Sequence, residues 1–180
     1  IHTTHLGIPY QLTARIWLCY RVAPQRVARI DAMDYSVAEL RVAITAGGAG
    51  IGLATAKQFI QAGARVHICD IEASRLIEAH NTMPGIGTTV AEVSDPNHVD
   101  RFIAEALEHL GGLDVLVNNA GFTHRNKPFL DVTEDEFDRV YDVNVKAIFH
   151  ALQEALPIFL KQGAGSVINT SSTAALRPRP

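Results

Sequence analysis

The sequence contains little cysteine and lacks the spacings that are typical of metal ligands. Only two cysteines occur, Cys19 and Cys69, and they are too far apart to form a CxxC pair. We therefore expect free thiols in a reducing compartment, without a disulfide framework, and a cytoplasmic protein. The eight histidines include no HxxxH or HExxH spacing, so the sequence predicts no metal site.

Long apolar runs and a strong charge of one sign are also absent. No stretch approaches the roughly 20 apolar residues that a membrane-spanning helix requires. The formal net charge is -3 and the pI is about 6.2, so nothing favours a nucleic acid or a membrane surface as a partner. A length of 180 residues with 47% hydrophobic residues fits one globular domain with a sizeable core.

The first 32 residues differ in character from the rest. They begin with Ile1 instead of methionine, and they carry four arginines against a single acid, Asp31. Three interpretations stay open for residues 1–32: an arginine-rich targeting segment, a docking arm, or translated sequence upstream of a start at Met33. We favour the third, because the segment has little periodicity and no clear cleavage signal.

From residue 40 onward, apolar runs rich in β-branched residues alternate with amphipathic segments. We expect strands at 40–45, 65–70, 88–93, 113–117 and 166–170, and helices at 52–62, 73–80 and 96–110. From 133 to about 160 we expect one helix or a broken pair of helices. Pro157 is expected to kink or end the last helix near the preceding residue. The alternation predicts an α/β fold with a doubly wound parallel sheet, the Rossmann fold.

The turn after the first of these strands is rich in glycine, and an acid ends the next strand. Residues 45–52 read TAGGAGIG. At such a strand-to-helix turn, backbone N–H groups and the helix dipole stabilise a pyrophosphate. Asp70 lies where a carboxylate accepts hydrogen bonds from the adenosine ribose and repels the 2′-phosphate of NADP, and no arginine follows until Arg75. The pattern predicts NAD(H) as cofactor; capping of the following helix by Asp70 is the open alternative.

Four motifs, in order along the chain, resemble those of the short-chain dehydrogenase/reductase family. The glycine turn resembles the family's TGxxxGxG, with Ala46 in place of the first glycine, and residues 118–121 read NNAG. Asn144 resembles the family's helix asparagine, and Ser171-Ser172 follows the last strand. The resemblance covers about Arg41 to Thr173. It implies an oxidoreductase that transfers a hydride between NAD(H) and a small alcohol or ketone.

The resemblance also implies roles for individual residues. Ser172 would bond the substrate oxygen, and Asn144 would hold a water molecule in a proton relay; these are the expected catalytic residues. The expected cofactor-binding residues are Thr45, Gly47, Gly50, Ile51, Gly52, Asp70, Ile71, Glu92, Val93, Asn118, Ala120 and Gly121. Turn formation by Asn118 and helix bending around Asn144 are the open structural alternatives. The complete protein is expected to be a homo-oligomer, a dimer or tetramer.

The family's catalytic Tyr-x-x-x-Lys motif has no counterpart in the sequence. None of the four tyrosines has a lysine four positions later, and by family spacing the tyrosine would fall just beyond Pro180. We therefore expect residues 33–180 to be a partial dinucleotide-binding domain, a fragment that is inactive alone and lacks the C-terminal strands and helices. The strand at 166–170 would then present an unpaired edge.

Three other functions remain open. The first is a non-catalytic NAD(H)-binding module, although such a module needs neither Asn144 nor Ser172. The second is an extended-type relative that acts on nucleotide sugars, which the spacing of the glycine turn disfavours. The third is a structural or interaction protein built on the same fold, because fold alone never determines function.

Overall fold

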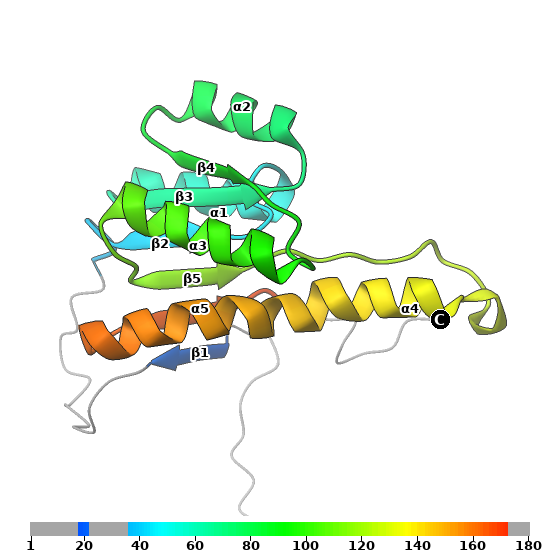
Figure 1. The fold of residues 1–180 in the computed structure, drawn as a ribbon. Helices are drawn as coiled ribbons and strands as arrows, with labels where there is room; N and C mark the ends of the chain where they lie inside the picture. The colour runs from blue at the N-terminus through cyan, green and yellow to red at the C-terminus, as the bar shows by residue number, and fades with distance from the viewer. Residues whose placement is uncertain (1–17, 22–35, 173–180) are drawn as a thin grey trace, which may run out of the picture.

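The computed structural model describes residues 18–21 and 36–172, which form an α/β fold around a single sheet (Figure 1). Its parallel strands, in the spatial order β4-β3-β2-β5-β6, are β2 (Arg41–Ile44), β3 (Arg65–Asp70), β4 (Gly87–Val90), β5 (Val115–Asn118) and β6 (Ser166–Asn169). The strand order reverses at β2, and in such sheets ligands bind in the crevice outside the carboxyl ends of the strands at the reversal. The predicted fold class is confirmed.

Helices cover both faces of this sheet (Figure 1). The helices are α1 (Gly50–Gln61), α2 (Ala73–Thr82), α3 (Pro96–Leu110), α4 (Glu134–Tyr141) and α5 (Ala147–Gln162). One buried cluster packs α3 and α5 against the sheet and contains Phe102 and Phe159; the other packs α1 and α2 and contains Ala56 and Leu76. Because both faces are covered, the strands are apolar without alternation, and residues 42–44 of β2 are fully buried.

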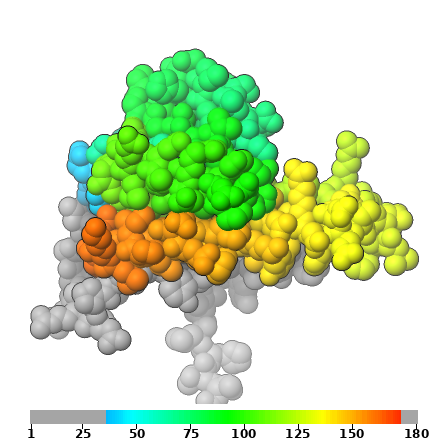
Figure 2. Space-filling view, in the orientation of Figure 1, coloured from blue at the N-terminus to red at the C-terminus, as the bar shows by residue number. Residues whose placement is uncertain are grey.

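The last helix does not end near Pro157, although an end there was one of the two outcomes expected of this proline. It continues to Gln162 and is closed by Gly163 in the left-handed conformation, with φ of 72°. A proline at position 157 removes the bond to the carbonyl of Gln153, and both side chains lie on the exposed side of the helix, where water can solvate that carbonyl. α4 and α5 are joined without a break by η2 (Asp142–Lys146), a π-helical turn. Figure 2 shows the resulting ridge, whose α4 end projects beyond the rest of the body.

The outer edge of β6 is paired, which also differs from the prediction. β1 (Leu18–Arg21) runs antiparallel to β6, with Leu18 opposite Asn169 and Arg21 opposite Ser166. A short segment of residues 1–32 thus forms the edge strand of the sheet. The remainder of that segment, and with it the question of a native start, lies outside the described residues.

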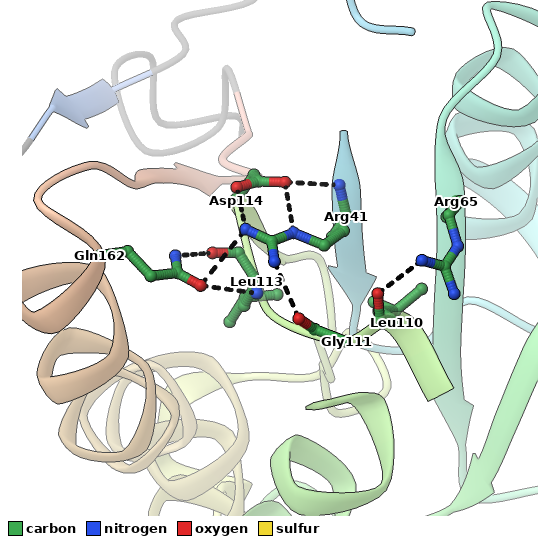
Figure 3. Close-up of polar contacts among 7 residues, drawn as sticks. All are labelled: Arg41, Arg65, Leu110, Gly111, Leu113, Asp114 and Gln162. Atoms are coloured by element: carbon green, nitrogen blue, oxygen red, sulfur yellow. Dashed lines mark hydrogen bonds and ion pairs between the residues drawn. The ribbon is translucent and has the colours of Figure 1, made fainter. Parts of the chain in front are cut away.

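The amino edge of the sheet is held by a group of polar contacts that we call the amino-edge latch: Arg41, Asp114 and Gln162 (Figure 3). The guanidinium of Arg41 donates two hydrogen bonds to the carboxylate of Asp114, from Nε to Oδ2 at 2.8 Å and from Nη2 to Oδ1 at 2.7 Å. It also donates through Nη1 to the carbonyl of Gly111. Gln162 accepts from the N–H of Leu113 and donates to its carbonyl. The hydrogen bond from Arg41 lowers the pKa of Asp114 below its usual range. The latch ties β2, the start of β5 and the end of α5 together.

Among the described residues, no helix is both long and apolar enough to cross a membrane. Within the same part of the chain, histidine, cysteine and acidic side chains form no group of three or more that could hold a metal ion.

Candidate functional site

The residues that the sequence singled out gather at the carboxyl edge of the sheet, opposite the amino-edge latch. The turn of residues 45–49 follows β2, Asp70 ends β3, Asn118 ends β5, and Ser172 follows β6. Parallel strands bring these ends to one edge, so residues distant in the sequence share one crevice.

The amino terminus of α1 is open to a ligand. The N-cap residue, Ala49, is extended, and in the described part of the chain no side chain caps the helix and no acid lies in its first turn. The first N–H groups of a helix have no partner within the helix, so those of Gly50, Ile51 and Gly52 are available to an anion. Gly50 has φ of 54°, and a Cβ there would meet no described atom within 4 Å. Free donors beside open space fit a pyrophosphate group.

Two other glycines of the turn serve close packing. A Cβ on Gly52 would collide with the carbonyl oxygen of Ala46, so this glycine lets α1 lie directly on the turn. A Cβ on Gly47 would lie 2.5 Å from Cβ of Ile68, and the N–H of Gly47 donates to the carbonyl of Cys69. Gly47, predicted to bind cofactor, is thus placed by the structure against β3, beneath the turn.

Thr45 and Asn119 fasten the turn to the end of β5. The hydroxyl of Thr45, which is buried, accepts hydrogen bonds from the N–H groups of Asn119 at 2.9 Å and Ala120 at 3.0 Å. The amide of Asn119 donates in return to the carbonyls of Thr45 and Ala46. Thr45 therefore fixes the conformation of the turn from its buried side. Asn119 was not among the predicted site residues, although its place in the NNAG motif was a signal for it.

Ala46 is strained at the position where the resemblance expects a glycine. Its φ is 50°, in the left-handed region that residues with a Cβ rarely adopt. The bonds from Asn119 and the contact with Gly52 hold this backbone in place. The departure from the motif therefore places a residue with a Cβ at a backbone conformation that favours glycine.

Asp70 is buried at the end of β3 and oriented by three donors. Its Oδ2 accepts from the N–H of Gly48 at 3.1 Å, and its Oδ1 accepts from the N–H of Glu72 at 3.1 Å. The guanidinium of Arg75, in the first turn of α2, lies 3.4 Å from Oδ1. The glycine turn, the strand end and α2 thus meet at this carboxylate, and the exposed Ile71 borders it. Arg75 was not predicted as a site residue.

The residues after β4 divide between the core and the surface. Val93 is buried in the core cluster, so its side chain supports the site from within. Glu92 is half-buried, and its carboxylate accepts a hydrogen bond from the hydroxyl of Ser94 at 3.0 Å. The predicted strand at 88–93 ends earlier, at Val90, so Glu92 lies on the loop that leads into α3.

The asparagines on the other side of the crevice make structural bonds. Asn118 is buried, and its amide donates to Oδ1 of Asn169 at 2.8 Å, which joins β5 to β6. Asn144 accepts from the N–H of Phe122 at 2.9 Å and donates to its carbonyl at 2.8 Å. A Cβ on Gly121 would lie 3.3 Å from Oδ1 of Asn144. Because Asn144 lies in the π-helical turn η2, the helix irregularity and the loop of residues 121–122 are coupled.

The remaining groups near the edge limit the chemistry available there. Ser172 is exposed and follows β6 on the same edge as the glycine turn. Burial raises the pKa of the Cys69 thiol to about 12, so it stays protonated and is not a nucleophile at neutral pH. The half-buried His124 belongs to the loop after residue 121, and its ring forms a hydrogen bond with the carbonyl of Arg125.

Comparison with known proteins gives consistent matches. A family model described as short chain dehydrogenase matches residues 41–180. A 4-formylbenzenesulfonate dehydrogenase from Comamonas testosteroni is 46% identical over 148 residues, which are 78% of this chain and 58% of the relative. Dehydrogenase/reductase SDR family member 4 from Bos taurus is 34% identical over 179 residues, 97% of this chain and 63% of the relative.

Among solved structures, the chain is similar to a 3-ketoacyl-(acyl-carrier-protein) reductase from Brucella melitensis in complex with NADH. The TM-score is 0.77 at 32% identity, over 81% of this chain and 62% of that chain. The protein thus spans about 60% of the length of these relatives.

Proposed function

The chain belongs to the short-chain dehydrogenase family, and we propose that it forms the nucleotide-binding part of an oxidoreductase that moves a hydride between NAD(H) and an alcohol or carbonyl compound. The observation that carries the proposal is the amino terminus of α1, which no side chain among the described residues caps and which lies near the buried carboxylate of Asp70. An anion-binding helix end and a ribose-binding acid are the two features that an adenine dinucleotide needs.

Different residues at the carboxyl edge would bind different parts of this cofactor. The N–H groups of residues 50–52 would bind the pyrophosphate, and Asp70 would accept from the ribose hydroxyls while Ile71 covers the adenine side. NAD(H), when bound, supplies or accepts the hydride. Ser172 would donate a hydrogen bond to the substrate oxygen, which polarises the carbonyl. Asn144 holds the loop at Phe122, and a second amide hydrogen remains for the proposed water.

Full turnover requires a general acid that the sequence does not supply at the family's spacing. An unperturbed tyrosine has a pKa near 10, and the family lowers it with a lysine four residues on. We therefore propose that the 180-residue chain binds NAD(H) with little or no hydride transfer. The bonds between Asn144 and the backbone of Phe122 also favour the second candidate, a non-catalytic NAD(H)-binding module. They give Asn144 a structural role that does not depend on catalysis.

An exposed apolar stripe supports a homo-oligomer. Along α4, η2 and α5, large apolar side chains recur every four residues on the exposed side, with one interval of seven between Phe149 and Leu156. They are Phe137, Tyr141, Val145, Phe149, Leu156 and Leu160. A second copy of the chain would cover this stripe, and we propose a dimer or tetramer of a cytoplasmic protein. Sedimentation of the chain at increasing concentration would test the oligomer, and a monomer at all concentrations would contradict it.

Binding of NADH is the direct test of the proposed function. We expect NADH fluorescence to rise on addition of the folded chain, and we expect Gly50→Asp to weaken binding by about tenfold relative to Gly50→Asn. Asp and Asn tolerate a positive φ to a similar degree and are nearly equal in size, so the two variants differ mainly in the charge placed beside the pyrophosphate. Equal affinities for the two variants, or no fluorescence change with the unaltered folded chain, would contradict a nucleotide site at α1.

A further inference from the structure

Arg75 is a cation held at the ribose end of the candidate site without a role in the core. It is the third residue of α2, its side chain is 50% exposed, and its Nη1 lies 3.4 Å from Oδ1 of Asp70. A Cβ on Gly48 would lie 2.9 Å from Cβ of Arg75 and 2.9 Å from Oδ2 of Asp70. The stem of Arg75 therefore packs directly beside the glycine turn, and its guanidinium lies at the carboxylate proposed to read the ribose.

The contact between Arg75 and Asp70 is weak compared with the other bonds of this carboxylate. Asp70 also accepts hydrogen bonds from the N–H groups of Gly48 and Glu72, both at 3.1 Å, and neither of these bonds involves Arg75. An ion pair at 3.4 Å with one half-exposed partner is easily exchanged for water or for another anion. The guanidinium is thus free to turn toward a competing anion without loss of the structure around Asp70.

The competing anion that fits this position is the phosphate on the adenosine ribose of NADP(H). That phosphate is esterified to the 2′-oxygen, the position from which an acid at the end of β3 excludes it and which a neighbouring arginine accommodates. Arginine binds phosphate through two parallel N–H bonds and keeps its charge at all relevant pH values. In this chain the repelling acid and the accommodating arginine lie side by side.

We propose that Arg75 is a second cofactor-specificity residue, whose guanidinium binds the 2′-phosphate and so limits the preference that Asp70 imposes for NAD(H). The inference rests on the proposed nucleotide site. The preference is then the difference between repulsion by Asp70 and attraction by Arg75. Removal of the Arg75 guanidinium increases the preference for NAD(H) over NADP(H). Removal of the negative charge of Asp70 reverses this preference as long as Arg75 is present.

The test is the ratio of dissociation constants for NADPH and NADH, measured by fluorescence titration of the full chain. Arg75→Ala is expected to weaken NADPH binding by about tenfold and to change NADH binding by less than about twofold. Arg75→Lys keeps the charge without the paired N–H geometry and should lie between. Asp70→Asn, which keeps the shape of the side chain, should strengthen NADPH binding, and Asp70→Asn combined with Arg75→Ala should lose that gain.

Lys57→Ala is the matched control, because it removes one positive charge from an exposed position on α1, seven residues after the start of that helix. An equal loss of NADPH binding in Lys57→Ala would overturn the inference, since the effect would then be one of overall charge. Equal weakening of both nucleotides by Arg75→Ala would overturn it as well, while the nucleotide site itself would stand. Failure of the folded, unaltered chain to bind either nucleotide would instead contradict the proposed function and the inference together.

Discussion

The two edges of the sheet use polar groups in opposite ways. At the amino edge, the latch of Arg41, Asp114 and Gln162 matches donors with acceptors and closes the ends of β2 and β5. At the carboxyl edge, the described residues leave the first N–H groups of α1 uncapped and hold Ala46 in a left-handed conformation. The hydrogen bonds of the amino edge stabilise the fold. The carboxyl edge holds N–H donors that a ligand can bind, beside a strained backbone at Ala46.

The largest effect we expect concerns His67, which lies in the amino half of β3. Its ring is buried and bonds the hydroxyl of Thr89 at 2.8 Å, and burial lowers its pKa to about 4. Because this value is below the usual 6.5, the unfolded chain takes up a proton first as the pH falls. The contribution of His67 to stability is therefore complete above about pH 6.5 and is lost between about pH 6.5 and 4, by roughly 3 kcal/mol.

Urea unfolding at several pH values would measure this loss. His67→Gln removes the titrating group and keeps a polar side chain, so its stability should vary less with pH across the same range. An unchanged pH dependence in His67→Gln would assign the effect to other groups. NADH binding by the folded variant at neutral pH should persist, because the carboxyl edge is left intact.

A change within the latch should lower stability without affecting the candidate site. Asp114→Ala removes the acceptor for three donors of Arg41, namely its backbone N–H, Nε and Nη2. Since the carboxylate is 28% exposed, we expect a loss of about 2 kcal/mol in the free energy of unfolding. The dissociation constant for NADH, measured well below the unfolding transition, should be unchanged. A large change in NADH affinity would show that the two edges are coupled, and the comparison would fail.

The smallest effect should have the opposite sign and come from the carboxyl edge. Ala46→Gly relieves the positive φ of 50°, but glycine also gains freedom in the unfolded chain. The balance favours the variant by about 0.5 kcal/mol, which thermal unfolding would detect as a small rise in Tm. A fall in stability would mean that the methyl group of Ala46 makes contacts that outweigh the strain.

Much of the fold could be predicted from the sequence because its signals are local. The runs at β2 and β3 are short, apolar and bounded by glycine or an acid, and the capping box of Thr133 and Glu136 forms as expected. The expected end of the helix at Pro157 was wrong, because the cost of a proline depends on whether the freed carbonyl is solvated, and this depends on which face of α5 is exposed. β1 was missed since a four-residue edge strand is stabilised by pairing with β6, far away in sequence.

The candidate site was predicted in part. The glycine turn and Asp70 were located because a dinucleotide fingerprint has a defined spacing, but the sequence could not separate residues that face the crevice from those that support it. Thr45, Gly47 and Val93 are buried beneath the site, while Gly50 borders open space. The assignment of individual residues to cofactor contacts stays a prediction.

The α/β fold, the family and the glycine turn before α1 could all be predicted from the order of residues, because strand and helix periods and motif spacing are properties of the chain alone. Three contacts depend on how the folded chain packs: Arg75 with Asp70, Asn119 with the glycine turn, and Arg41 with Asp114 at the opposite edge. Two of these contacts join residues more than 70 positions apart. Such pairs arise because parallel strands lie side by side in the sheet and helices pack closely against it. A local sequence pattern does not specify which residues these arrangements bring together.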